Sequence, residues 1–255
     1  MLFRTSILHT PTGIGIMKLT DFKALSFDCY GTLIDWETGI LNTLRPWVEA
    51  NDIKASPDKI LEVFGECESI EEVAMPSKPY PEILEGVQAS LCQFFKVKST
   101  KEDRKNLANS VGDWPLFPDS FEALKYLKQH FKLVILSNVD KASFNHSNKK
   151  LGIDFDAIYV AGEIYNYKPS KKNFFHMLEH GEADLSLIKG DFIHTAQSLF
   201  HDHKPAIEMG FTTCWIDRRG NKGGGITPKL ESPIKPHFKF GSMAELVKAV
   251  KMELV

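Results

Sequence analysis

Four short stretches of the sequence contain polar side chains that could carry out chemistry. They are Asp28 to Thr32, Ser137-Asn138, Lys168-Pro169 and Gln197 to Asp202. A carboxylate can attack an electrophilic carbon or phosphorus and form a covalent intermediate that water then hydrolyses. A nearby lysine favours the ionised form of that carboxylate by charge pairing. The residue types alone therefore indicate a pocket with two acids and one lysine.

Each of these residues has a functional interpretation and a structural alternative. Asp28 is the candidate nucleophile, and otherwise an ordinary cap at the end of a strand. The Thr32 hydroxyl could orient that carboxylate or only stabilise a turn. Ser137 and Asn138 offer donors at a strand end, where an anionic substrate group is favoured, although helix capping would use the same residues. Lys168 is the candidate partner of Asp28, but on spacing alone it would be a solvated lysine.

Short apolar runs separated by helical stretches must position these side chains. The runs are Lys23 to Asp28, Lys132 to Leu136, Ala157 to Val160, Phe192 to Thr195, Thr213 to Ile216 and His237 to Phe240. Strands that alternate with helices of about ten residues indicate a parallel sheet with helices on both faces. Ligands bind such sheets beyond the carboxyl ends of the strands, which is where the polar stretches follow the runs.

Between Glu37 and Trp114 the pattern changes to amphipathic helices. The predicted helices are Ile40 to Ala50, Pro57 to Val73, Pro81 to Phe95 and Lys101 to Val111. An all-helical insertion after the first strand of an α/β sheet suggests a lid over the end of that strand. We therefore predict an N-terminal tail (1–20), a Rossmann-like α/β core domain (21–36 and 115–255) and a helical cap domain (37–114).

Composition and charge exclude several classes of protein. The 255 residues include 31 basic and 33 acidic side chains, which gives a formal net charge of −2. This balance offers no electrostatic case for a nucleic-acid or membrane partner. No apolar run in the sequence approaches the roughly 18 residues of a membrane span. The four cysteines lie far apart, unlike the close pairs of zinc or redox sites, and are interpreted as buried side chains in a reducing compartment.

Two further segments are predicted from composition. The first twenty residues contain Arg4 and Lys18 but no acid, and they faintly resemble a transit peptide. A frayed tail or a translation start at Met17 is the favoured interpretation, so a cytoplasmic location is expected. The stretch from Gly220 to Pro236 is rich in glycine and proline and is predicted to be a surface loop.

In order and spacing, the four polar stretches resemble the four sequence motifs of the haloacid dehalogenase (HAD) superfamily. The resemblance extends from about Lys23 to Asn221, apart from the helical insertion. The stretches Phe27 to Leu33 and Phe211 to Asn221 are especially similar to the L-2-haloacid dehalogenase branch. The resemblance implies a hydrolase that uses Asp28 as its nucleophile.

Two positions depart from the pattern of most superfamily members, which are phosphatases. Tyr30 stands where phosphatases have an acid that protonates the leaving group, a step worth roughly 10² to 10⁴ in rate. Gln197 replaces the first of two acids in the fourth motif that help hold Mg²⁺. Losing both acids disfavours a stable Mg²⁺ site, because Mg²⁺ needs oxygen ligands that include carboxylates. The prediction is therefore no cofactor, with Mg²⁺ expected only if the chain is a phosphatase.

The resemblance implies a reaction in which Asp28 displaces halide from the α-carbon of a short 2-haloacid. Activated water then opens the aspartyl ester to the 2-hydroxy acid with inversion, and Asp202 orients that water or pairs with Lys168. The alternatives are a Mg²⁺-dependent phosphatase and a binding protein that kept the fold but lost turnover. The expected partner is a small organic acid, and a homodimer is an expectation because related dehalogenases are often dimers.

Substrate-binding residues are predicted from the strand ends and from the lid. They are Tyr30, Trp36, Arg45, Ser137, Asn138, Gln197 and Ser198. Known dehalogenases use a lid arginine to bind halide or carboxylate, and Arg45 is the candidate for that role, with Trp36 and Trp47 as apolar walls. The alternative places Arg45 at the surface and both tryptophans in the core. Three histidines flank Asp202 and could assist, although a zinc site is not expected: His194, His201 and His203.

Overall fold

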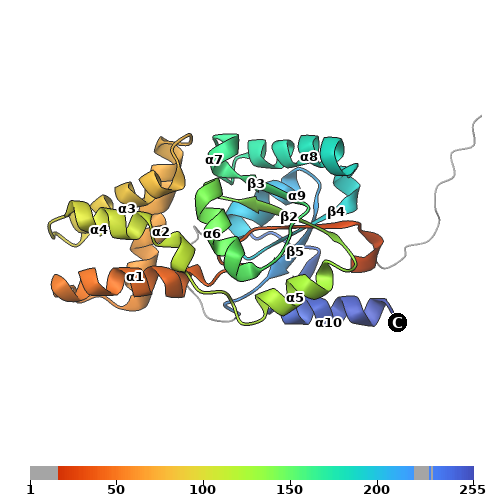
Figure 1. Ribbon diagram of the computed structural model, residues 1–255, viewed down its shortest axis with the longest axis horizontal. Coiled ribbons are helices and arrows are strands. Elements are labelled where there is room, and N and C mark those ends of the chain that lie inside the picture. Colours follow the sequence, from red (N-terminus) through yellow and green to blue (C-terminus); the bar gives the residue numbers. More distant parts are fainter. Residues whose placement is uncertain (1–16, 221–229, 231) are drawn as a thin grey trace, which may run out of the picture.

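The fold is a six-stranded parallel sheet with helices on both faces (Figure 1), as seen in a computed structural model that describes residues 17–220, 230 and 232–255. The strands are β1 (Ala24–Phe27), β2 (Lys132–Ser137), β3 (Ala157–Val160), β4 (Phe192–Ala196), β5 (Thr212–Ile216) and β6 (Phe238–Phe240). Their order is β3-β2-β1-β4-β5-β6, and every neighbouring pair is parallel. The predicted Rossmann-like α/β class is confirmed. Most of the predicted tail and of the predicted loop after Gly220 lies outside the described residues.

Helices cover both faces of this sheet because alternate strand residues point to opposite sides. The helices are α5 (Ser120–Leu127), α6 (Lys141–Leu151), α7 (Ala161–Ile164), α8 (Lys171–Leu185), α9 (Lys204–Glu208) and α10 (Met243–Glu253). Leu25 and Phe27 of β1 belong to the core that includes Phe144 of α6. Ala24 belongs to the second core, with Phe174 of α8. The two cores fix the sheet from both sides, and Figure 1 shows α8 and α10 on opposite faces.

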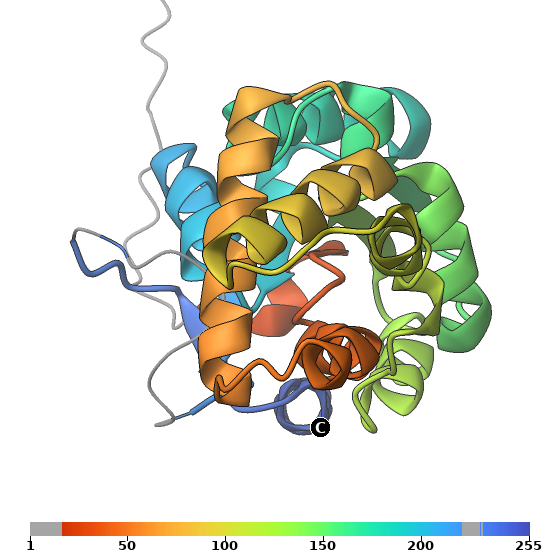
Figure 2. The same cartoon turned by 90° about the vertical axis from the view of Figure 1, so that its left-hand side faces the viewer.

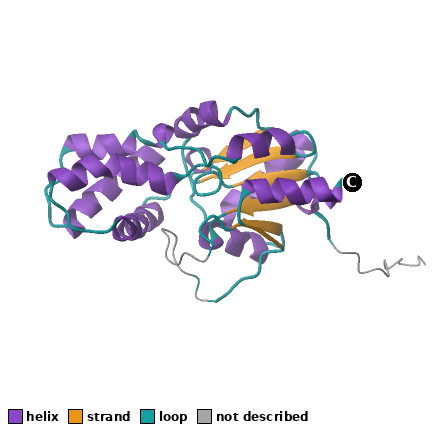
Figure 3. Cartoon of the chain, turned by 90° about the horizontal axis from the view of Figure 1, so that it is seen from below, coloured by secondary structure: helices purple, strands orange, loops and turns teal. Residues whose placement is uncertain are grey.

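Four helices lie between β1 and α5 in the sequence and form what we call the helical layer. They are α1 (Trp36–Ala50), α2 (Pro57–Ala74), α3 (Tyr80–Phe94) and α4 (Lys101–Ala108). Side chains cap three of their N-termini, because Asp35, Ser56 and Thr100 each accept a hydrogen bond from a backbone N–H three residues later. Figure 3 shows this layer at one end of the sheet, apart from the strands, and Figure 2 shows the same layer facing the viewer. The domain boundaries we predict stay a prediction.

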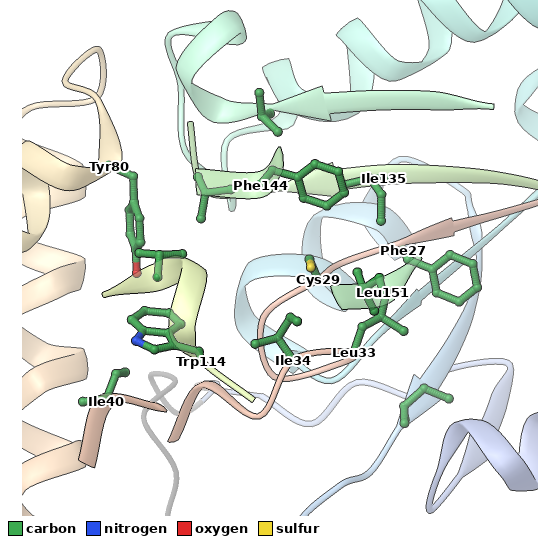
Figure 4. Close-up of a cluster of buried hydrophobic side chains, with 14 of the residues drawn as sticks. Phe27, Cys29, Leu33, Ile34, Ile40, Tyr80, Trp114, Ile135, Phe144 and Leu151 are labelled. Atoms are coloured by element: carbon green, nitrogen blue, oxygen red, sulfur yellow. The ribbon is translucent and has the colours of Figure 1, made fainter. Parts of the chain in front are cut away.

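The apolar core continues from the sheet into the helical layer. Figure 4 shows Trp114 between Ile34, which follows β1, and Tyr80 of α3. A Cβ atom at Gly39 would lie 2.3 Å from the Trp114 ring, so only glycine fits at this crossing of α1. The Trp114 indole N–H donates to the Ser110 hydroxyl at 3.0 Å. This packing holds the helical layer in place over the carboxyl ends of the strands.

Helix ends differ from the predicted ones by a few residues. The helix from Lys101 ends at Ala108, where the Ser110 hydroxyl donates a hydrogen bond to the Leu107 carbonyl oxygen. A separate 3-10 turn covers Val111–Asp113. The stretch from Ser120 to His130, which its apolar spacing predicts to be helical, forms a helix that ends at Leu127. Three of the four cysteines are buried and the fourth is half-buried, all as free thiols. Among the helices of the described residues, none is long and apolar enough to cross a membrane.

Candidate active site

The strand register brings the polar stretches together at one edge of the sheet. Phe27 at the end of β1 pairs with Ile135 on one side and Thr195 on the other. The stretches that follow β1, β2 and β4 therefore meet beside one pocket, with a volume of about 50 Å³. The pocket is lined by Asp28, Tyr30, Trp36, Glu68, Glu72, Tyr80, Ser137, Asn138, Val139, Lys168, Gln197, Ser198, His201 and Asp202.

Lys168 lies at the centre of the site, 2% exposed, and bonds both acids. Its Nζ is 2.9 Å from Asp28 Oδ1, 2.6 Å from Asp202 Oδ1 and 2.8 Å from the Leu136 carbonyl oxygen. Burial would lower the pKa of this ammonium, but the two carboxylates outweigh burial and raise it. Lys168 is therefore a fixed cation whose three N–H groups all have acceptors.

The Asp28 carboxylate is held through both of its oxygens. Oδ1 accepts from Lys168, and Oδ2 accepts from the Thr32 hydroxyl at 2.8 Å. The turn that brings Thr32 back to Asp28 includes Gly31, whose φ of 96° is a positive value that glycine adopts readily. The Thr32 hydroxyl itself accepts from the Gln197 backbone N–H at 2.9 Å. Burial raises the pKa of Asp28, and the bonds from Lys168 and Thr32 oppose that rise by stabilising the carboxylate.

Asp202 lies on a π-helical turn, Leu199–His203, directly after β4. Its Oδ1 accepts from Lys168 and also lies 2.9 Å from His194 Nε2. On the other side of that ring, Nδ1 lies 2.9 Å from the Ser26 hydroxyl. Burial would raise the pKa of Asp202, but the charge of Lys168 and the hydrogen bond from His194 outweigh burial and hold this pKa well below its usual range. Asp202 is the stably ionised acid of the pair.

His194 is completely buried, so its bond to Asp202 makes a measurable contribution to stability. Replacing His194 by phenylalanine is expected to lower the free energy of unfolding by about 1.5 to 3 kcal/mol, since hydrogen bonds to charged groups are worth that much. The matched change Ser26→Ala removes only the outer, neutral bond and is expected to cost about 1 kcal/mol. Urea unfolding of the two variants measures both values. If the two variants lost equal free energies of unfolding, the His194–Asp202 bond would be no stronger than the Ser26–His194 bond, against this prediction.

The other residues predicted at the strand ends also lie at the pocket. Asn138 bridges to the lysine loop, because its Nδ2 donates to the Lys168 carbonyl at 3.0 Å and its Oδ1 accepts from the Lys168 N–H at 2.7 Å. The Ser137 hydroxyl is buried and has no hydrogen-bond partner among the described residues. The Ser198 hydroxyl accepts from the His201 N–H at 2.9 Å, which is the capping role. Tyr30 turns its hydroxyl to Ser147 at 2.9 Å, and Gln197 lines the pocket beside Gly31.

Of the three predicted residues from the first lid helix, the structure brings one to the pocket. Trp36 lines the pocket and packs edge-on against Phe64. Arg45 does not reach it, because this side chain is exposed and donates to Asn42 Oδ1 at 2.8 Å on the outer face of α1. Trp47 is buried against Phe95 in the helical layer, away from the lining residues.

The helical layer contributes pocket residues that our sequence prediction lacks. Glu68 and Glu72 lie one turn apart on α2, each 7% exposed, and Tyr80 donates to Glu68 Oε1 at 2.5 Å. Both Glu72 oxygens lie 3.4 Å from Asn138 Nδ2. The available sequence signal was the spacing of four residues from Phe64 to Glu68 and of four more to Glu72, which puts both acids on the apolar face of α2.

Two of the histidines near Asp202, His201 and His203, are neutral in this environment. Burial lowers the pKa of His201 to about 4, and burial likewise lowers the pKa of His203 to about 4. His203 Nε2 lies 2.9 Å from the Ala196 carbonyl oxygen, so it donates to the strand end. Within the described part of the chain, no group of three or more His, Cys, Asp or Glu residues is placed to hold a metal ion.

Known proteins resemble the chain in sequence and in fold. Residues 22–184 match the family model of the haloacid dehalogenase-like hydrolases. An N-acylneuraminate-9-phosphatase of Rattus norvegicus is 25% identical over 250 residues, 90% of this chain and 94% of the relative. An (S)-2-haloacid dehalogenase of Pseudomonas sp. (strain YL) is 24% identical, covering 82% of this chain and 89% of the relative.

Solved structures show the same architecture. The L-2-haloacid dehalogenase from Xanthobacter autotrophicus with chloropropionic acid covalently bound superposes with a TM-score of 0.73, at 17% identity, over 90% of this chain and 98% of that one. At this identity the similarity shows the fold alone. The family model, in contrast, matches more than half of the chain. At the edge of the sheet, Lys168 forms ion pairs with Asp28 and Asp202. The chain belongs to the haloacid dehalogenase-like hydrolases.

Proposed function

We propose that the chain is a metal-independent hydrolase of the 2-haloacid dehalogenase type. In the first step, the Asp28 carboxylate attacks the α-carbon of a short 2-haloacid, the carbon–halogen bond breaks, and an aspartyl ester forms. In the second step, water held by Asp202 attacks the ester carbonyl and releases the 2-hydroxy acid. Asp28 is then regenerated for the next turnover.

The observation that carries this proposal is the position of Lys168 between Asp28 and Asp202. The charge and hydrogen bond of Lys168 oppose the rise in the pKa of Asp28 that burial causes, which favours the ionised carboxylate that acts as nucleophile. Oδ1 of Asp202 already accepts from Lys168 and His194, which leaves Oδ2 for a water molecule. The two acids therefore have separate tasks, attack and water activation.

The polar groups of the pocket provide a place for the substrate carboxylate. The Ser137 hydroxyl is buried without a partner among the described residues, and a buried hydroxyl of this kind gains stability from a ligand oxygen. Ser137 ends β2, next to Asn138. Both residues line the pocket together with Asp28, so a substrate carboxylate bound there would lie beside the nucleophile.

One of the proteins similar in sequence is a phosphatase, so Mg²⁺-dependent phosphate hydrolysis is the competing function. Mg²⁺ requires near-octahedral oxygen ligands with carboxylates among them. Here Tyr30 turns its hydroxyl to Ser147, Gln197 is an amide, and Oδ1 of Asp202 accepts two hydrogen bonds. These residues do not fit a Mg²⁺ ion, which favours the dehalogenase-type reaction.

Halide release from 2-chloropropionate is expected to proceed at the same rate with and without excess EDTA. The physical reason is that attack by Asp28 needs only the Lys168 ammonium to balance its charge. Ion chromatography of released chloride measures the rate. If no chloride appears from either enantiomer while Mg²⁺ stimulates phosphate release from an aryl phosphate, the competing function is the correct one.

A further inference from the structure

A chain of buried hydrogen bonds runs from Asp202 away from the pocket and into the sheet. His194 on β4 and Ser26 on β1 are both completely buried, and they are register partners in the parallel sheet. His194 Nε2 is 2.9 Å from Asp202 Oδ1, and His194 Nδ1 is 2.9 Å from the Ser26 hydroxyl. A hydroxyl both donates and accepts, so Ser26 can hold the ring at Nδ1 whichever protons the ring carries. The imidazole is therefore fixed at both of its nitrogens.

Packing alone does not require a polar side chain at position 194. The ring packs edge-on against Phe174, with ring centroids 5.0 Å apart, and the residues before it on β4 are the buried Phe192 and Ile193. A buried polar ring in such surroundings costs free energy unless it is hydrogen-bonded. Its bonds go only to Ser26 and to Asp202, and His194 is not one of the residues that line the pocket. Its link to the chemistry therefore runs through Asp202.

The bond from His194 fixes the orientation of the Asp202 carboxylate. Oδ1 of Asp202 accepts from Lys168 Nζ at 2.6 Å and lies 2.9 Å from His194 Nε2. Two donors on one oxygen restrict rotation of the carboxylate more than one donor does. Among the described residues none donates to Oδ2, and Asp202 lines the pocket. Oδ2 is thus left as the free acceptor of this carboxylate.

This restriction matters most after the aspartyl ester has formed. Before the reaction, Lys168 Nζ bonds one oxygen of Asp28 and one of Asp202, so the two carboxylates lie on two sides of a single nitrogen. Esterification removes the charge of Asp28, and Asp202 is then the only carboxylate that Lys168 contacts among the described residues. An ammonium attracts both oxygens of a single carboxylate. The bond from His194 to Oδ1 opposes a rotation that would turn Oδ2 to the lysine as well.

We propose that His194, held by Ser26, is a positioning residue for hydrolysis of the aspartyl ester, and that it keeps Oδ2 of Asp202 turned toward the attacking water. This inference rests on the proposed function, because it presupposes an ester on Asp28. His194 touches neither the substrate nor the water and acts only through Asp202. The displacement of halide uses no water, so this first step does not depend on the orientation of Asp202 in the same way.

In the hydrolytic step, the oxygen of the water forms a bond to the ester carbonyl carbon of Asp28, and one water proton passes to Oδ2 of Asp202. The bond between that carbon and the substrate oxygen then breaks, and the departing oxygen takes the proton from Asp202 to give the 2-hydroxy acid. Asp28 is left as a carboxylic acid, which loses its proton to solvent. Asp202 ends the step ionised, as it began, and His194 neither gains nor loses a proton.

Single-turnover reactions with 2-chloropropionate test this role, because acid quenching and mass analysis of the peptide containing Asp28 follow formation and decay of the ester separately. In His194→Phe we expect the rate constant of ester hydrolysis to fall at least tenfold, since general base help is worth roughly 10² to 10⁴. The rate constant of ester formation is expected to change less than threefold, so the ester accumulates. His194→Gln is the matched variant, because its amide N–H can donate to Asp202 Oδ1, and it is expected to recover most of the lost rate.

A loss of folded protein does not imitate this result, because both rate constants are independent of the fraction of active enzyme. Equal slowing of ester formation and hydrolysis in His194→Phe, or the same slow hydrolysis in His194→Gln, would overturn the inference and leave the proposed function standing. Absence of both chloride and ester in the wild type would overturn the proposed function, and the inference with it.

A double variant checks that His194 acts through Asp202. Asp202→Asn alone is expected to slow ester hydrolysis, and adding His194→Phe is expected to slow it no further, because the base that His194 positions is already absent. A further tenfold fall in the double variant would show that His194 acts by another route and would overturn the inference. Circular dichroism of each variant at the assay temperature confirms that the reaction is measured on folded protein.

Discussion

Replacing Asp28 by asparagine is expected to abolish turnover and to leave the folded state at least as stable as the wild type. The amide cannot form the aspartyl ester, and removing a nucleophile that acts together with its neighbours typically costs 10⁴-fold or more in rate, so a loss of about that size is expected. The free energy of unfolding is expected not to fall, because the site would then contain one buried carboxylate, Asp202, paired with Lys168 instead of two.

Halide release and urea unfolding measure these two effects on the same preparation. The control is the wild type incubated with substrate and then digested, where the peptide containing Asp28 should show the mass of the ester. Activity of Asp28→Asn above about one hundredth of the wild type, without reversion by deamidation, would show that a different residue attacks the substrate.

Replacing Lys168 by methionine is expected to lower the free energy of unfolding by about 3 to 5 kcal/mol, the usual cost of removing one partner from a buried ion pair. Asp28 and Asp202 would then face each other without a cation, at 6% and 1% exposure. Methionine fills a volume similar to that of lysine, so the loss in the free energy of unfolding measures the removal of the charge rather than a change in packing. Turnover is expected to disappear as well, because the pKa of Asp28 would rise further without the ammonium.

A double variant identifies the cause of this loss. Adding Asp28→Asn to Lys168→Met removes one of the two unpaired carboxylates and is expected to recover part of the lost stability, as measured by urea unfolding. Additive losses in the double variant would show that the two side chains do not interact, against the 2.9 Å distance between Lys168 Nζ and Asp28 Oδ1.

Much of the fold was predictable because the strands are short apolar runs that end at polar residues. β1 to β5 lie within one or two residues of the predicted runs. The contact of Lys168 with the two acids was expected from the order of the motifs, because spacing alone predicts a solvated lysine. Asp28 and Asp202 were expected at one edge of the sheet, since the segments after parallel strands meet there. Their positions depend only on the sheet, and the sheet depends on local sequence patterns.

The contribution of the helical layer was harder to predict because it depends on how each helix is rotated about its axis. Ile40, Leu44 and Trp47 form the buried face of α1. Arg45 follows Leu44 by one residue, about 100° around the helix, and therefore points outward. The helical period alone would have argued against Arg45. The approach of Glu72 to Asn138 depends in addition on how α2 sits over the sheet, which no local pattern specifies.

The central place of β1 also affects how the chain is completed during synthesis. Ala24 pairs with Lys132 on one side and with Phe192 on the other. A ribosome that adds 5 to 20 residues per second reaches β4 roughly 8 to 30 s after β1 has been made. During this interval one edge of β1 has no strand partner, and the nascent segment is a target for chaperones. β1 is thus translated before β2 and β4 but has both of its partners only after β4 is made, so the pocket beside Asp28 can form only once β4 has been translated.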